Sequence, residues 1–235
     1  MTAEVGSLAD VEFRDLRTAD DLAVLPPFER RIWGSTSDLV SLNMLVAIIS
    51  EGGVALAAFD GGVIVGAVFG FPTHEPNVLH SHYMAVDPAW RRRGLGVELK
   101  QRQRRWCLDR GITAMRWTYD PLQLANAHLN LEALGAAGVA YHENHYGTLG
   151  GINGDLPSDR VTVRWDLVAA GADRPAPTQS FVVPPVTADD IAASNHTALT
   201  ARLAVRAELA HRLGRGWVLV GVDRDARRYD LAPAG

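Results

Sequence analysis

The chain has 235 residues, of which 47% are hydrophobic and 21% are charged, and its formal net charge is −4. These values are close to the averages of globular proteins and allow a substantial core. The acidic balance argues against a protein that mainly wraps nucleic acid, and the single cysteine, Cys107, excludes an internal disulfide.

The sequence shows no targeting or membrane segment. Met1–Asp10 lacks a basic region followed by an apolar core, as a signal peptide would have. Apolar runs such as Val63–Phe71 fall short of the ~20 residues that a membrane helix needs. We therefore expect a cytoplasmic protein that has neither a membrane nor nucleic acid as a partner.

Strand and helix patterns alternate along the first part of the chain. Glycines at 61 and 62 after Asp60 are typical of a tight hairpin turn, and Thr18 is a typical helix cap. We predict a strand over Val11–Arg17, a helix over Thr18–Trp33 broken by Pro26 and Pro27, a helix over Leu39–Ser50, and a hairpin around Asp60–Gly62.

The pattern continues in the second part with a strand that stops at Pro88 and helices that end at glycines. The predicted elements are a strand over His80–Asp87, a helix over Gly94–Arg110, a strand over Ile112–Tyr119, a helix over Leu122–Leu134, and strands over Val139–Tyr146 and Arg160–Leu167. Strands and helices in this order predict an α/β fold with a mixed sheet.

The composition changes to Ala, Gly, Pro and polar residues after the last of these strands. We predict a main domain over residues 1–168, a linker over 169–180, and a C-terminal helix and hairpin over 181–235. A segment of this size is too small to fold alone, so it should pack on the main domain or on a partner subunit, and a homodimer is compatible with this. We interpret the arginines of its helix as a solvated face.

One short motif, Arg91-x-x-Gly94-x-Gly96, lies between a predicted strand and a predicted helix. A helix N-terminus has unpaired N–H groups and a partial positive charge, so a glycine-rich turn there can bind a phosphate closely. Arg91, Arg92 and Arg93 add positive charge, and basic residues continue along the helix at Lys100, Arg102, Arg104 and Arg105. The simpler alternative is an ordinary loop followed by a solvated helix.

This motif, preceded by "MAVDP", resembles the acyl-CoA pyrophosphate loop of the GNAT acyltransferase superfamily. The element order from Val11 to Leu167 is also that of the superfamily. The resemblance implies acetyl-CoA as the acyl donor, no metal, and a GNAT-like seven-stranded mixed sheet that splays open between the strands ending at Val86 and Tyr119. It implies that pantetheine bonds to the backbone of Met84, Ala85 and Val86, and that pyrophosphate lies on the amides of Arg91, Arg92, Arg93, Gly94, Leu95, Gly96 and Val97.

Two histidines occupy alternate positions of the strand before this loop, so both rings should lie on one face. Histidine suits the removal of a proton from an amine, because its pKa lies near neutrality. The run His80-x-His82-x-Met84 is similar to that of arylalkylamine N-acetyltransferases, in which two histidines relay the proton through water. The alternative is that both are polar packing groups.

The proton donor for the leaving thiolate is less evident. Superfamily members often place a tyrosine four residues before a Gly-Phe pair, where this chain has Leu131. Tyr119, Tyr141 and Tyr146 are candidates, of which we select Tyr146, and unassisted departure is the alternative. Asn126 matches a position that often contacts the cofactor, and it is equally explained as an ordinary polar residue after Pro121.

A metal site is the other chemistry to weigh, because His142, Glu143 and His145 are close in sequence. Their spacing is not that of the zinc motif H-E-x-x-H, and on a strand positions 142 and 145 face opposite sides. We therefore predict no metal. These residues are expected to line the acceptor pocket, as are the loops over 74–79 and 147–158.

Together these features predict an acetyl-CoA-dependent N-acetyltransferase that acts on a primary amine of a small molecule by direct transfer. His82 would be the base, with His80 behind it through water. The alternative is a non-catalytic module that binds acyl-CoA as a sensor.

Overall fold

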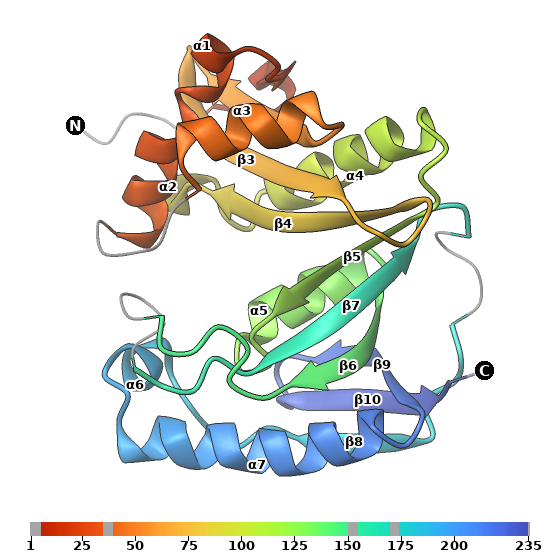
Figure 1. Ribbon diagram of the computed structural model, residues 1–235. Coiled ribbons are helices and arrows are strands. Elements are labelled where there is room, and N and C mark those ends of the chain that lie inside the picture. Colours follow the sequence, from red (N-terminus) through yellow and green to blue (C-terminus); the bar gives the residue numbers. More distant parts are fainter. Residues whose placement is uncertain (1–5, 35–39, 150–154, 170–173, 235) are drawn as a thin grey trace. The chain divides into compact units, whose positions relative to one another are not determined.

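The computed structural model describes residues 6–34, 40–149, 155–169 and 174–234 (Figure 1). The chain divides into two compact units, residues 1–115 and 116–235, and each is described by itself. No helix among the described residues combines the length and apolar character needed to cross a membrane.

Unit 1 contains the first predicted elements in the predicted order. They are η1 (Leu8–Asp10), β1 (Glu12–Asp15), α1 (Ala19–Leu22), α2 (Leu25–Trp33), α3 (Leu42–Ser50), β2 (Val54–Asp60), β3 (Val63–Pro72), β4 (Val78–Val86), η2 (Pro88–Trp90) and α4 (Leu95–Leu108). Thr18 caps α1, and Pro26 and Pro27 start α2 rather than interrupting one long helix. A proline is tolerated in the first helical turn because its missing N–H has no partner there.

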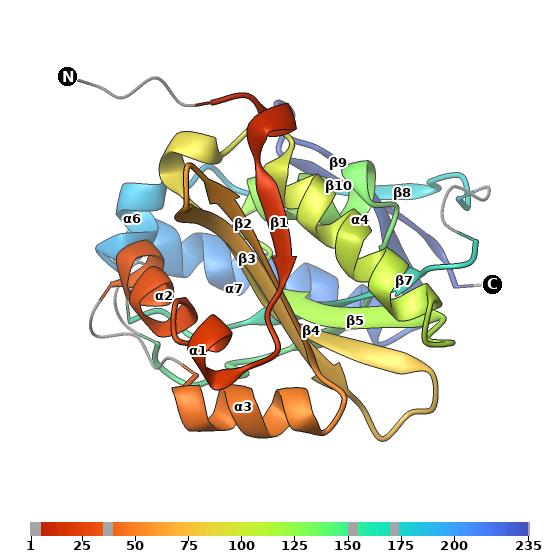
Figure 2. The ribbon, with the colours of Figure 1, turned by 90° about the horizontal axis from the view of Figure 1, so that it is seen from above.

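The strands of unit 1 form an antiparallel sheet in the order β1-β2-β3-β4. Gly61 and Gly62 connect β2 to β3 with positive φ angles of 53° and 83°, so the predicted hairpin is confirmed. Figure 2 shows α1–α3 on one face of β2–β4 and α4 on the other.

Each face of this sheet is closely packed. On one face, leucines and aromatic residues of α1–α3 form a core with Ala57, Phe69 and Ala85 of the strands. On the other face, Gly66 lets α4 approach, because a Cβ there would lie 2.9 Å from the Leu99 Cδ1 atom. The glycine therefore sets the distance between α4 and the sheet.

Unit 2 contains the remaining elements. They are β5 (Ala114–Tyr119, which begins at the unit boundary), α5 (Leu124–Ala127), the π-helix η3 (His128–Ala133), β6 (Ala137–His142), β7 (Arg160–Asp166), β8 (Gln179–Val182), α6 (Ala188–Ala192), α7 (His196–Leu213), β9 (Trp217–Asp223) and β10 (Arg228–Pro233). The strand order is β5-β7-β6-β9-β10-β8. The strand predicted over Val139–Tyr146 ends earlier, at His142, because a turn begins at Glu143.

The C-terminal segment completes the core of unit 2. Its strand β9 pairs with β6 at Gly138 and Leu219, and α7 packs against β6 and β9. Arg202 of α7 forms two 2.7 Å hydrogen bonds to the Asp120 carboxylate, and its side chain is 2% exposed. The interpretation of this helix's arginines as a solvated face was therefore wrong at Arg202.

Two parts of the sequence prediction stay predictions. The splay between the strands ending at Val86 and Tyr119 concerns both units. The predicted linker falls partly on 170–173, outside the described residues, and β8 begins at Gln179, before the linker's predicted end. The fold class itself is confirmed, since strands and helices form an α/β structure with sheets flanked by helices.

Candidate active site

The two histidines lie at an irregularity of β4. In the pairing with β3, Tyr83 faces Phe69 and Ser81 faces Gly70, so His82 is an extra residue that has no partner in β3. Such a β-bulge bends the strand and redirects side chains. The His80 and His82 ring centroids are 5.9 Å apart, so the structure brings the two predicted bases together.

Aromatic side chains surround both rings. The Phe71 ring centroid lies 4.9 Å from that of His80 and 5.7 Å from that of His82, and Phe69 lies 6.1 Å from His82. His80 is half-buried, whereas His82 is exposed. The rings around His82 exclude enough water to lower its pKa below the ordinary 6.5, because burial disfavours the charged imidazolium. The neutral form can accept a proton at pH 7.

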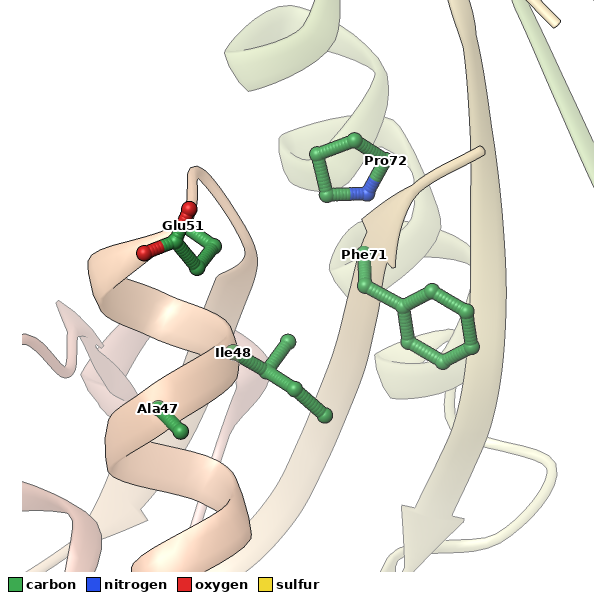
Figure 3. A pocket seen from close by; sticks show the side chains of 5 residues that line it. All are labelled: Ala47, Ile48, Glu51, Phe71 and Pro72. Atoms are coloured by element: carbon green, nitrogen blue, oxygen red, sulfur yellow. The ribbon is translucent and has the colours of Figure 1, made fainter. Parts of the chain in front are cut away.

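A shallow hollow lies next to this aromatic group. Its volume is about 320 Å³, and its walls come from the end of α3 and the end of β3 (Figure 3). Ile48 points from α3 toward β3, and Phe71 connects the hollow to the histidines. The residues that line it are Ala47, Ile48, Glu51, Phe71 and Pro72.

The predicted phosphate loop has an unusual backbone. Arg92 and Gly94 have positive φ angles of 61° and 85°, with one residue between them. Arg91, Arg92 and Arg93 are exposed, and the Arg91 Nε atom donates to the Val86 carbonyl oxygen at 3.3 Å. Left-handed residues in such a turn direct successive N–H groups toward one side, as in anion-binding nests.

The start of α4 is open. Serine, threonine or asparagine side chains cap α1, α3, α6 and α7, whereas α2, α4 and α5 have no side-chain cap among the described residues, and Gly94 is the N-cap residue of α4. Its first N–H groups therefore remain available to an anion. Gly96 faces β4, because a Cβ there would lie 3.3 Å from the Met84 Cε atom.

Three of the basic residues that continue along α4 have partners of their own or are buried. Arg102 and Arg105 pair with the Glu98 carboxylate at 2.7 and 3.0 Å. Lys100 is only 2% exposed and points into the unit, so its assignment to a basic surface was wrong. Positions 100, 103 and 107 share one helix face, and this spacing could have indicated its burial.

The three candidate tyrosines differ in exposure. The Tyr119 hydroxyl is buried and donates to the Tyr229 hydroxyl at 3.3 Å. The Tyr141 hydroxyl donates to the Asp159 carboxylate at 2.7 Å, and burial raises its pKa. Tyr146 is 46% exposed, and its hydroxyl lies 3.1 Å from the Thr118 Oγ1 atom. Among these three tyrosines, Tyr146 is the most exposed residue.

The helix that carries Leu131 is a short α-helix continued by a π-helix. Leu131 is fully buried in it, so neither its chemistry nor its position allows it to be a proton donor. Asn126 lies on α5 with its side chain exposed, whereas Asn130 is buried and accepts a hydrogen bond from Trp117. Asn126 is therefore available to a ligand.

His142 and His145 do not face opposite sides as predicted. Their ring centroids are 4.8 Å apart, because the strand ends at His142 and the following turn folds His145 back. The described residues contain no group of three or more His, Cys, Asp or Glu side chains placed to hold a metal ion. The His145 ring also contacts the Tyr146 ring edge to face, with centroids 4.5 Å apart.

The sequence did not predict the hollow or the group of aromatic rings around His80 and His82. Ile48 and Phe71 belong to apolar runs that look like any core segment. Only the placement of the α3 terminus beside β3 gives them a common surface. One signal was available: Phe69 and Phe71 are two positions apart in one predicted strand, as His80 and His82 are in the next, and this spacing could have indicated a shared aromatic face.

The sequence and fold were compared with known proteins. A model of the acetyltransferase (GNAT) family matches residues 20–135. A comparison with curated protein sequences found no match.

Solved structures share the fold at low sequence identity. The ribosomal-protein-S18-alanine N-acetyltransferase from Escherichia coli is 20% identical, with a TM-score of 0.56 over 70% of this chain and 98% of its own. A GNAT superfamily phosphinothricin acetyltransferase from Sinorhizobium meliloti, solved in complex with AcCoA, is 16% identical, with a TM-score of 0.55 over 71% of this chain and 94% of its own. Residues 20–135 therefore form a GNAT acetyltransferase domain.

Proposed function

We propose that the protein transfers the acetyl group of acetyl-CoA to a primary amine of a small molecule, directly and within a ternary complex. One observation carries the proposal. His82, with its pKa lowered by burial, lies beside His80 on the bulge of β4, the strand that leads into the phosphate loop. A base and an anion site are thus held on consecutive segments of unit 1.

The donor would be held by the loop and by the start of α4. The amides from Arg91 to Val97 would bind the diphosphate, and the exposed arginines would add charge. The backbone of Met84, Ala85 and Val86 would bond to pantetheine, and Asn126 would add a polar contact. The AcCoA complex of the Sinorhizobium meliloti enzyme, which shares the fold, supports acetyl-CoA as donor.

His82 would take the proton that the acceptor ammonium must lose. The ring centroids of His80 and His82 lie 5.9 Å apart, a spacing at which two ring nitrogens that face each other can share one bridging water. The neutral amine would then attack the carbonyl carbon, the C–N bond would form, and the C–S bond would break. The departing thiolate would take a proton from Tyr146, the exposed one of the three candidate tyrosines. The new amide nitrogen would lose its second proton, which restores the Tyr146 hydroxyl, and His82 would release the first proton to solvent.

The hollow beside Phe71 supports a small acceptor. Its volume of about 320 Å³ lies at the lower end of the range for ligand pockets. Ile48, Phe71 and Pro72 would contact the apolar body of the amine, while its nitrogen approached His82. The exposed arginines of the loop serve the donor, and nothing in the charge of the chain favours nucleic acid as a partner.

The first experiment measures thiol release from acetyl-CoA with a panel of primary amines. Wild type should turn over at least one amine, and His82→Ala should reduce kcat at least 100-fold, as expected for loss of a general base. His211→Ala is the matched control, because His211 is an exposed histidine in the last turn of α7. CoA binding without turnover of any amine would favour the sensor function instead.

The pH dependence of the same reaction tests the role of His82. The acceptor ammonium gives its proton to His82, which must be neutral to accept it. In wild type, log(kcat/KM) should therefore be flat below the amine pKa of about 10 and should fall with a slope of 1 only below the His82 pKa. Since burial lowers that pKa, the break should lie below pH 6.5. His82→Ala should instead show a slope of 1 throughout, and a break retained in this variant would exclude His82.

A further inference from the structure

Three polar side chains are buried together between α4 and β4. Ser81 and Lys100 are 2% exposed, and Gln103 is fully buried. Burying an amine in an otherwise apolar layer is unfavourable unless its hydrogen bonds are satisfied. These three residues are not part of the proposed donor, acceptor or proton-transfer groups, and their burial therefore needs another explanation.

The three side chains bond to one another around the Ser81 hydroxyl. Lys100 Nζ donates to Ser81 Oγ at 2.6 Å, and Ser81 Oγ donates to Gln103 Oε1 at 2.8 Å. Lys100 Nζ also lies 3.5 Å from Gln103 Oε1. The serine hydroxyl is thus held by side chains from two consecutive turns of α4. The N-terminus of the same helix is part of the predicted phosphate loop.

Ser81 stands directly between His80 and His82, next to the bulge. The regular pairing between β3 and β4 is interrupted there, because His82 has no partner in β3. A bulged segment is held less firmly by the ladder of backbone hydrogen bonds. The hydrogen bonds from α4 to the Ser81 side chain can replace the missing backbone hydrogen bonds to β3. They would thereby fix the direction in which His82 points.

Gly70, the β3 partner of Ser81, leaves space for this arrangement. A Cβ at Gly70 would lie 3.0 Å from the Gln103 Nε2 atom and 2.7 Å from the His80 carbonyl oxygen. A Cβ at this position would crowd the Gln103 amide and would clash with the backbone of β4. The sheet is therefore adapted to the cluster on the strand opposite the histidines.

The charge of Lys100 is compatible with proton transfer nearby. Burial lowers its pKa to about 7, so above pH 7 it is mainly a neutral amine, which still donates to Ser81. The Cys107 thiol on the same helix face is neutral as well, because burial raises its pKa to about 12. A neutral layer behind β4 does not oppose the positive charge that His82 acquires.

We propose that Ser81, Lys100 and Gln103 form a positioning cluster that fixes the bulge of β4 and thereby orients His82 for proton transfer. The inference rests on the proposed function, because it assigns the cluster to the base of that reaction. The three residues never touch the substrate. They are positioning residues, and they should affect the rate of transfer rather than donor binding.

Two variants separate positioning from folding. Ser81→Ala removes the central hydroxyl. The triple variant Ser81→Ala/Lys100→Met/Gln103→Leu replaces all partners by apolar side chains of similar shape, which can leave stability nearly unchanged. Both should lower kcat at least 10-fold and change the KM for acetyl-CoA less than threefold. Cys107→Ala, on the same buried face of α4, is the control and should keep kcat within twofold.

An NMR titration of the histidine rings provides a readout that does not require turnover. In wild type, the His82 pKa should lie below 6.5, and in the triple variant it should move toward that value as the ring leaves its aromatic surroundings. A folded triple variant with unchanged kcat and unchanged His82 pKa would overturn the proposal. If wild type acetylates no amine, the proposed function fails, and the titration alone still supports or overturns the cluster.

Discussion

At the scale of single residues, Phe71 has a double role. Its ring contacts both histidines, and it also forms a wall of the hollow between α3 and β3. A side chain in this position lowers the local water content around His82 and would touch the acceptor at the same time. It therefore links the basicity of His82 to acceptor binding.

Gly96 provides a prediction at the same scale. Gly96→Asp places a negative charge at the open start of α4, where it would repel the diphosphate and occupy the helix N–H groups. The dissociation constant of CoA, measured by calorimetry, should rise more than tenfold, which corresponds to more than about 1.4 kcal/mol.

Gly96→Ala is the steric control for this experiment. The added Cβ would lie 3.3 Å from Met84 Cε, the end of a flexible side chain that can move aside. We expect a change in CoA affinity of less than threefold. An equally small change for Gly96→Asp would place the donor elsewhere.

At the scale of elements, α4 and β4 act as a pair. The loop between them has the positive φ angles of an anion site, and the buried face of α4 holds the segment of β4 that carries the histidines. Donor binding and base orientation would thus depend on the same helix. A shift of α4 along the sheet would change both.

The helix α7 gives a prediction about stability. Removing Arg202 leaves the buried Asp120 carboxylate with only the longer ion pair to Arg160, at 3.7 Å, so Arg202→Met should lower the free energy of unfolding by about 3 kcal/mol. Urea unfolding followed by circular dichroism would measure this. Arg212→Met, on the same helix, removes a partially exposed pair with Glu208 and should cost less than about 1 kcal/mol. Similar losses for both variants would contradict the assignment of Arg202 to the core.

At the scale of the whole molecule, the C-terminal segment is part of the core of unit 2. Without residues 169–235, Asp120 would lose Arg202, Asp159 would lose Arg206, and the edge of β6 would lose Leu219. The shortened chain would therefore expose apolar surface and leave two carboxylates without their main partners.

We predict that a chain of residues 1–168 does not reach a stable fold. Its chemical denaturation should lack the cooperative transition of the full chain, and a protease should digest it rapidly under conditions in which the full chain resists. A cooperative transition in the shortened chain, with protection similar to that of the full chain, would show instead that residues 1–168 form an independent domain.

Much of the fold follows from local sequence signals. Thr18 caps a helix and Gly61-Gly62 forms a hairpin turn because capping and turn formation depend on neighbouring residues in the chain. The same holds for the loop from Arg91 to Gly96, whose glycines and position between a strand and a helix predicted an open helix start. These features were predictable because each is decided within a few residues.

The tertiary structure decided which side chains are buried and which ones meet. Lys100 has the sequence environment of a surface residue, yet it bonds to Ser81, which is 19 positions away. The sequence does not distinguish Tyr119, Tyr141 and Tyr146, and only their packing leaves Tyr146 the most exposed of the three. The sequence by itself determined the elements and the anion loop, because these depend on local backbone chemistry. The structure alone decided the surroundings of His82 and the anchoring of α7, because burial and charge pairing depend on segments that are distant in the chain.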